Sequence, residues 1–286
     1  MGPYDKLFIY ELSDEISVKG DVFGPDFIGC WNETGSSFLF FTRNQDEEVM
    51  RWLAQQGRVM IVSSHIMDYR DWQAGEDFNP FRIERLVICP SWGDAGIGED
   101  EILIRLDPGV VFGTGLHPTT RGCLMALWRI YQVDSPQKVL DVGTGTGILA
   151  IAATKLGARE VLAIDLNELA VETARKNVLL NGVEDRVEVR WGQAEASVDE
   201  KADLALANLH FQVIDALLKQ KALSSKRWIV LSGLFHGQVG GVLAPLEKRR
   251  LKVFEKMEED RWVTLILRKT PAEGGSTDGN GKRPYG

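Results

Sequence analysis

The chain has 286 residues, of which 44% are hydrophobic and 26% charged, and its formal net charge is −8. These values are typical of a soluble globular protein long enough for two domains, and they argue against a nucleic-acid-binding surface. Three isolated cysteines and four scattered histidines predict neither a disulfide framework nor a metal site. With no signal-peptide pattern and no membrane-length apolar run, we expect a cytoplasmic protein without a membrane partner.

Residues 1–72 predict a small α+β domain. A strand, hairpin, helix, strand series of this kind can form an open sandwich with a helix on one side. The segment 13–25 reads as a loop. The predicted elements are strands at 6–12 and 59–67, a pair of strands within 27–41 that turns at 32–37, and a helix at 46–56.

Residues 73–115 are predicted to be a linker region with some order of its own. Its segment 84–92 is apolar, and 102–106 reads as a strand. The turn-forming residues 107–120 follow, and a helix is predicted at 121–132. Thr119 or Thr120 can cap that helix, because a hydroxyl satisfies the exposed N–H groups of a helix start.

Residues 116–270 predict a second, larger domain in which strands and helices alternate. Such alternation predicts a parallel sheet that is covered by helices on both faces. The last strands, within 251–267, read as an antiparallel pair, and a helix kinked at Pro245 is predicted before them, at 237–249. Residues 271–286 predict a disordered tail.

The most informative stretch is VLDVGTGTGILA at 139–150, where three glycines separate two apolar runs. It lacks the lysine of a nucleotide P-loop, but counted from Gly145 it fits the dinucleotide pattern GxGxxA. Asp141 at the strand end would repel a pyrophosphate and attract the ammonium and sulfonium of S-adenosylmethionine, unless it only bonds loop amides. Gly143 and Gly145 let the backbone approach such a cofactor closely.

Three later strand ends supply further candidate contacts. Asp165, 24 residues after Asp141, can accept both ribose hydroxyls, although nicotinamide enzymes also place an acid there and a helix cap is an alternative. Gln193 or the Ala194 amide could bond the adenine edge, or belong to an ordinary loop. Asn208 follows the fourth strand, near the expected methyl position, where it could also be a turn asparagine.

The region 70–268 resembles the ribosomal protein L11 methyltransferases of bacteria, within the class I S-adenosylmethionine-dependent superfamily. The resemblance rests on FGTGLHPTT, VLDVGTGTGILAIAATKLGA, VLAIDLNELAVETARKNVLLNGV, LANL and VLSGL. It implies a Rossmann-like seven-stranded sheet, preceded by a ferredoxin-like domain that grips the ribosomal protein and a flexible linker. It also implies cofactor contacts at Thr120, Gly143, Asp165 and Asn208.

The expected activity is methyl transfer from S-adenosylmethionine to lysine side chains or the N-terminal α-amine of ribosomal protein L11. Asn208 is the predicted catalytic residue, because an oxygen near the accepting nitrogen stabilises the charge that develops there. His117 and His210 are candidate bases by position only. The stretch LHFQVI after Asn208 departs from the family pattern. This departure leaves a methyltransferase with another substrate as an alternative function. A nicotinamide oxidoreductase and a non-catalytic cofactor-binding regulator are two further alternatives.

Overall fold

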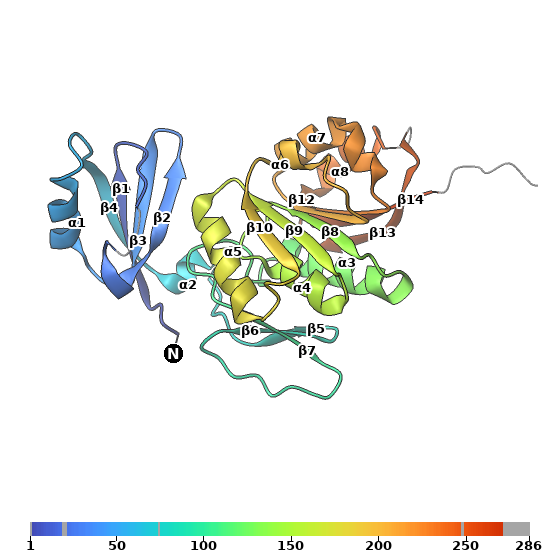
Figure 1. The fold of residues 1–286 in the computed structure, drawn as a ribbon, viewed down its shortest axis with the longest axis horizontal. Coiled ribbons are helices and arrows are strands. Elements are labelled where there is room, and N and C mark those ends of the chain that lie inside the picture. Colours follow the sequence, from blue (N-terminus) through green and yellow to red (C-terminus); the bar gives the residue numbers. More distant parts are fainter. Residues whose placement is uncertain (1, 19–21, 74, 247–248, 271–286) are drawn as a thin grey trace, which may run out of the picture.

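A computed structural model describes residues 2–18, 22–73, 75–246 and 249–270. It contains a four-stranded sheet, a three-stranded sheet and a seven-stranded sheet (Figure 1). The tail predicted at 271–286 lies outside the described residues. Among the helices described, none is long and apolar enough to cross a membrane.

The four-stranded sheet has the order β2-β3-β1-β4, and all its neighbouring strands are antiparallel. This is the strand order of a ferredoxin-like sheet. One crossover is helical, and the other contains a loop with the short 3-10 helix η1 (Gly24–Asp26) in its described part, as the loop predicted at 13–25 anticipated. The elements are β1 (Lys6–Leu12), β2 (Phe27–Glu33), β3 (Ser36–Phe41), α1 (Asp46–Leu53) and β4 (Ile61–Asp68).

The segment 73–115, predicted as a linker, contains a sheet that belongs to the core of the larger unit. Leu86 and Ile88 of β6 and Ile104 and Leu106 of β7 are fully buried in the same apolar cluster as helices α3 and α4. This region is therefore anchored between 81 and 106. The elements are α2 (Tyr69–Trp72), β5 (Phe81–Ile83), β6 (Leu86–Pro90) and β7 (Ile102–Leu106).

The large sheet confirms the predicted seven-stranded architecture. Its order is β10-β9-β8-β11-β12-β14-β13, with the first five strands parallel and β14 antiparallel to both neighbours. The strands are β8 (Lys138–Val142), β9 (Glu160–Asp165), β10 (Val187–Trp191), β11 (Leu204–Asn208), β12 (Trp228–Phe235), β13 (Leu251–Glu259) and β14 (Trp262–Lys269).

Helices cover the large sheet on both faces (Figure 1). In β11, Leu204 and Leu206 face one apolar cluster, while Ala205 and Ala207 face the other, as the two-residue period of a strand requires. The first face carries α3 (Pro118–Val133), α4 (Ile148–Leu156) and α5 (Glu168–Leu180). The second carries α6 (Ala194–Ser197), α7 (Phe211–Lys219), η2 (Lys221–Ser225), η3 (His236–Gln238) and α8 (Val239–Leu243).

The helix predicted at 237–249 is shorter than expected. In the described part of this range, the structure has the turn η3 and the five-residue α8, which ends at Leu243, two residues before Pro245. Proline lacks the N–H that a continuing α-helix would use, which is consistent with an end at this point.

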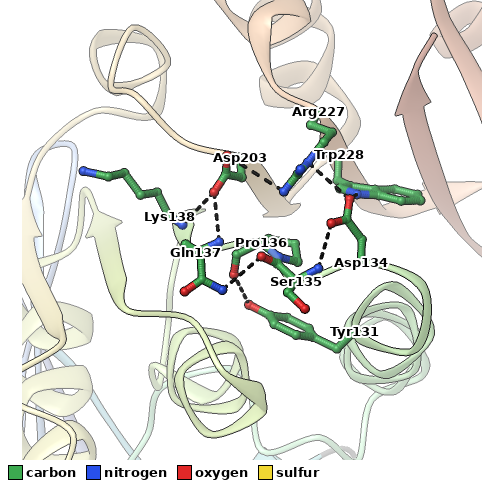
Figure 2. A network of polar contacts seen from close by, with 9 residues as sticks. All are labelled: Tyr131, Asp134, Ser135, Pro136, Gln137, Lys138, Asp203, Arg227 and Trp228. Carbon is green, nitrogen blue, oxygen red and sulfur yellow. Dashed lines mark hydrogen bonds and ion pairs between the residues drawn. The ribbon is translucent and has the colours of Figure 1, made fainter. Parts of the chain in front are cut away.

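The amino ends of the strands are held by a polar network (Figure 2). Asp134, just after α3, accepts hydrogen bonds from the Trp228 indole N–H (2.7 Å) and pairs with Arg227 (3.2 Å). Asp203 accepts the backbone N–H groups of Gln137 and Lys138 at 2.9 and 3.0 Å. These bonds fix the loop that leads from α3 into β8.

The small sheet of residues 6–68 packs beside the carboxyl end of the large one. Leu7 and Phe40 share an apolar cluster with Val110, Val111 and the start of α5. A Cβ atom on Gly29 would lie 2.2 Å from Leu169 Cδ1, so β2 approaches α5 very closely. The two units therefore meet next to the edge where the candidate cofactor residues lie.

Candidate functional site

The glycine loop between β8 and α4 is locked in place by other parts of the chain. Gly143 and Gly145 have φ angles of +72° and +56°, which favour glycine. A Cβ at Gly143 would lie 2.2 Å from Leu209 Cδ2, and one at Gly145 would lie 2.5 Å from the Phe112 carbonyl oxygen. The bare backbone is thus needed for packing against these two residues. Direct cofactor contact by the two glycines remains a prediction.

The FGTG turn at 112–115 lies directly on the glycine loop. The Thr146 hydroxyl donates to the Gly113 carbonyl at 2.6 Å, and the Thr146 N–H donates to the Phe112 carbonyl at 3.2 Å. Sequence reasoning assigned both segments to turns but did not foresee this pairing. Both segments contain alternating glycine and threonine, but this pattern does not indicate that the two segments contact each other.

Asp141 lies beneath the glycine loop and is fully buried. Its Oδ2 accepts the Thr144 hydroxyl at 2.6 Å, whereas Oδ1 has no hydrogen-bond partner among the described residues. Burial raises the pKa of Asp141 to about 7, against the Thr144 hydrogen bond and with help from the Asp165 charge. The sequence placed this carboxylate at the crevice. The structure places it under the loop with one acceptor free, so direct contact with the cofactor stays a prediction.

Asp165 ends β9 beside the same loop. Its Oδ2 accepts the Gly145 N–H at 2.9 Å and its Oδ1 accepts the Asn167 N–H at 3.0 Å. Burial raises its pKa although these N–H groups oppose the rise. The cap of α5 is Asn167, whose Oδ1 accepts two N–H groups of the first turn. Asp165 is therefore not the helix cap, and each of its oxygens keeps a lone pair for a ligand hydroxyl.

Asn208 and Thr120 meet across the site although 88 residues separate them. The Asn208 Nδ2 donates to the Thr120 Oγ1 at 3.3 Å. Thr120 is buried in the first turn of α3, and Asn208 ends β11. Two residues that the family resemblance singled out independently are therefore in contact.

Helix α3 begins three residues earlier than predicted, and a histidine caps it. The His117 Nδ1 accepts the Thr119 N–H at 3.3 Å and lies 2.8 Å from the Thr119 Oγ1. The predicted cap at Thr119 or Thr120 is wrong, because Pro118 takes the first helical position, where no N–H is needed.

The two candidate bases have different surroundings. The His117 ring lies 5.3 Å from the Phe112 ring and 5.0 Å from the Trp262 ring. Burial, with Arg121 and Arg261 nearby, lowers the pKa of His117 against the Glu259 charge and so favours the neutral ring. His210 is exposed at the start of α7, where its side chain makes no cap bond. Only His117 is thus held in a defined environment.

The remaining adenine-site candidates lie where the sequence placed them. Gln193 directly precedes α6, and its side chain makes no cap bond. The neighbouring Gly192 N–H donates to the Asp165 carbonyl at 2.9 Å, which brings this loop to the end of β9. A contact between Gln193 or Ala194 and an adenine remains a prediction.

A cleft of about 310 Å³ opens between the four-stranded sheet and the FGTG turn. Trp31 and Trp72 line one side, and Phe112 and His117 line the other. An adjoining apolar groove of about 420 Å³ shares the two tryptophans and continues over the small sheet. Sequence reasoning missed both hollows, since they depend on how the small sheet packs against the larger unit.

The residues at this edge fit a cationic adenosyl cofactor. The glycine loop carries no lysine or arginine, Asp165 offers acceptors for hydroxyls, and Asp141 has a buried acceptor without a partner. Such a set favours a cation with ribose hydroxyls over a pyrophosphate. Within the described ranges, no three His, Cys, Asp or Glu side chains gather as a metal site would require.

Comparison with known proteins places this site in a family. A family model described as ribosomal protein L11 methyltransferase (PrmA) matches residues 28–270. A ribosomal protein L11 methyltransferase of Heliobacterium modesticaldum is 38% identical over 202 residues, which are 69% of this chain and 63% of that protein. The chain thus spans less than two thirds of that relative's length. One from Caldicellulosiruptor bescii is 36% identical over 218 residues, 75% of this chain and 70% of the relative.

A solved structure agrees with these matches. The ribosomal protein L11 methylase from Lactobacillus delbrueckii subsp. bulgaricus is 34% identical with a TM-score of 0.59, and the match covers 67% of this chain and all of that one. The chain belongs to the ribosomal protein L11 methyltransferase family, a family of S-adenosylmethionine-dependent enzymes.

Proposed function

We propose that this chain transfers methyl groups from S-adenosylmethionine to amines of ribosomal protein L11, on lysine side chains, on the N-terminal α-amine, or on both. The observation that carries the proposal is the contact between Asn208 and Thr120 beside the glycine loop, within a chain of this family. The names of the relatives supply the substrate. The activity belongs in the cytoplasm, where ribosomal proteins are made.

The chain's own residues bind and orient the donor. Bound S-adenosylmethionine supplies a methyl group on a positively charged sulfur, a good leaving group. Asp165 accepts the ribose hydroxyls, and Asp141 adds negative charge beneath the loop when it is ionised. Holding donor and acceptor in line is worth up to about 7–11 kcal/mol of the barrier, so alignment is the main task of the protein.

The acceptor amine must be neutral to attack. Its lone pair forms the new N–C bond as the C–S bond breaks, and the C–S electron pair stays on sulfur. The new ammonium then loses a proton before any further transfer. The carbonyl oxygen of Asn208 stabilises the positive charge that develops on nitrogen. The neutral His117 ring carries its proton on Nε2, because Nδ1 accepts the Thr119 N–H. His117 can therefore donate a hydrogen bond from Nε2 toward the cleft, but it is not assigned as the base.

The hollows beside the site suit the approach of a protein substrate. Trp31 of β2 and Trp72 of α2 line both the cleft and the groove, and the cleft reaches His117. Aromatic walls bury much apolar area and attract cationic side chains such as lysine. We therefore assign recognition of the ribosomal protein to the unit of residues 1–72, with residues 116–270 as the catalytic unit.

The test is methylation of purified ribosomal protein L11 with labelled S-adenosylmethionine, followed by mass spectrometry of the modified amines. Ribosomal proteins from cells with and without the gene provide the matching comparison. Label that appears only on other proteins in a lysate would refute the substrate. Binding of the cofactor without turnover on any acceptor would identify a non-catalytic regulator. Calorimetric binding of NAD but not of S-adenosylmethionine would favour an oxidoreductase.

A further inference from the structure

Two buried hydroxyls, which the proposed mechanism does not use, lie next to the site. Ser232 of β12 is fully buried, and Thr264 of β14 is 4% exposed. Their oxygens are 2.7 Å apart. In the sheet, Ser232 pairs directly with Asn208 of β11. The two hydroxyls therefore lie beside the strand end that carries the predicted catalytic residue.

The direction of the hydrogen bonds follows from counting protons. The Ser232 Oγ donates to the Thr119 carbonyl oxygen at 3.1 Å. A hydroxyl has a single proton, so the bond between the two hydroxyls must be donated by Thr264 to Ser232. The result is a chain from β14 through β12 to the first turn of α3. All three groups are buried, where an unmade hydrogen bond is costly.

Helix α3 also lies in direct contact with Thr264. A Cβ atom on Gly122 would be 2.2 Å from the Thr264 Oγ1. Only glycine allows this approach without a shift of the helix. The first turn of α3 is thus fixed to the sheet by a close contact at Gly122 and by the hydrogen bond at Thr119.

That first turn carries Thr120, which determines how the Asn208 amide is oriented. The Asn208 Nδ2 donates to the Thr120 Oγ1, so the amide oxygen on the same carbon points away from Thr120. The backbone after Asn208 is held as well, because the Leu209 N–H donates to the Ser232 carbonyl at 3.1 Å. Ser232 therefore holds Thr119 with its side chain and Leu209 with its backbone.

We propose that Ser232 and Thr264 are positioning residues for methyl transfer. They hold Thr120 against Asn208 and thereby aim the Asn208 carbonyl oxygen at the acceptor amine. Among the described residues neither hydroxyl hydrogen-bonds the glycine loop or Asp165, so the expected donor contacts at those positions stay in place without them. This role rests on the proposed function, since it concerns the step in which the amine is methylated.

The experiment compares two variants of Thr264 that differ in one property. Thr264→Val keeps the shape and removes the hydroxyl, whereas Thr264→Ser keeps the hydroxyl and removes a buried methyl. We expect kcat for methylation of ribosomal protein L11 to fall about 10- to 100-fold in Thr264→Val and in Ser232→Ala. Thr264→Ser should stay within about threefold of the wild type. Calorimetric affinity for S-adenosylmethionine should fall by a much smaller factor than kcat in Thr264→Val and Ser232→Ala, because Asp165 and the glycine loop are unchanged.

If the two hydroxyls had a purely structural role, the Thr264 variants would rank differently in kcat. Loss of a buried methyl would then make Thr264→Ser at least as impaired as Thr264→Val, and that result would overturn the proposal. So would a kcat for Thr264→Val equal to that of the wild type. If both variants fold and Thr264→Val loses affinity for the donor as strongly as it loses kcat, the hydroxyl acts on binding and the proposal is also wrong.

A second readout does not depend on the acceptor. The Asn208 side-chain amide gives its own pair of NMR signals, which can be assigned by their loss in Asn208→Asp. We expect these signals to keep their positions in Thr264→Ser and to shift or broaden in Thr264→Val. Should the wild type methylate no amine of ribosomal protein L11, the proposed function fails while these signals still decide the positioning role. Unchanged signals in Thr264→Val contradict it.

Discussion

The two ends of the large parallel sheet use aspartates in opposite ways. At the amino end, Asp134 and Asp203 bond or pair with backbone N–H groups, an indole and a guanidinium (Figure 2). At the carboxyl end, Asp141 is fully buried with one oxygen that has no partner in the described chain. A satisfied polar network stabilises a fold, whereas an unsatisfied buried acceptor reduces stability and leaves a place for a ligand.

The pKa shifts follow the same division. Burial raises the pKa of Asp141 to about 7, because it outweighs the hydrogen bonds from Thr144 and the Ala150 backbone, and the Asp165 charge adds to the rise. Burial also acts on Asp134, but the Trp228 indole, the Ser135 N–H and the Arg227 guanidinium outweigh it and lower the pKa of that carboxyl. Similar residues at two ends of one sheet thus differ in whether the fold or a ligand completes their hydrogen bonds. Ligands in open α/β sheets bind at the carboxyl ends of the strands, in agreement with this division.

The largest expected effect is on donor binding at the carboxyl end. Asp165→Ala removes the proposed acceptor for the ribose hydroxyls, and two charge-assisted hydrogen bonds are worth about 3–6 kcal/mol together. We expect the calorimetric affinity for S-adenosylmethionine to fall about 100-fold or more. An unchanged affinity would show that the carboxyl end of the sheet is not the donor site, and the contrast between the two ends would not hold. Asp134→Ala serves as the control and should bind normally.

At the amino end the expected effect is on stability. Asp134→Ala leaves the indole N–H of the fully buried Trp228 without a partner, which costs about 1–3 kcal/mol of unfolding free energy. The lost ion pair with the half-exposed Arg227 costs only a few tenths of a kcal/mol more. Asp134→Asn keeps an acceptor and should lose less. Urea denaturation measures both, and equal losses in the two variants would show that the indole bond is not the important contact.

The pH dependence should have opposite sign at the two ends. The wild type loses the stability tied to Asp141 as the pH rises through about 7, because the raised pKa disfavours the ionised form in the folded state. The lowered pKa of Asp134 gives stability that is lost as the pH falls toward acid values. Asp141→Asn should therefore stabilise the protein at pH 8 but not at pH 5.

The size of that gain follows from two opposing costs. A shift from 3.8 to about 7 corresponds to at most about 4 kcal/mol at high pH, and the unpartnered amide of asparagine gives back about 1–3 kcal/mol. We expect a net gain of about 1 kcal/mol at pH 8 in thermal or urea unfolding, together with weaker donor binding. A variant that is less stable at pH 8 than at pH 5, relative to the wild type, would contradict the raised pKa of Asp141.

The sequence predicts the elements of the four-stranded and seven-stranded sheets well, because hydrophobic periodicity and glycines mark them locally. The seven-stranded sheet and its antiparallel end, implied by the family resemblance, are confirmed. Asp165 and Asn208 could be named because each ends a strand, and the carboxyl ends of parallel strands meet at one edge. Patterns within one strand or one loop are therefore sufficient to locate the edge.

Contacts between distant segments could not be predicted in this way. Nothing local to Thr146 indicates that it bonds Gly113, and nothing near Ser232 indicates Thr264. The burial of Asp141 depends on how the glycine loop folds over it, so sequence reasoning placed its carboxylate in the open crevice. Side chains that join two elements are specified by packing and not by spacing along the chain.

The smallest expected effect is at Gln137, in the middle of the amino-end network. Its side chain donates to the Ser135 carbonyl at an exposed position, whereas the bond to Asp203 comes from its backbone N–H. Gln137→Ala should therefore change the unfolding free energy by no more than about 0.5 kcal/mol. Asp203→Ala removes the acceptor of two backbone N–H groups and should cost about 1–3 kcal/mol. Urea denaturation measures both changes. An equal loss of unfolding free energy in the two variants would show that the Gln137 side chain stabilises the loop into β8 as much as the Asp203 carboxylate does.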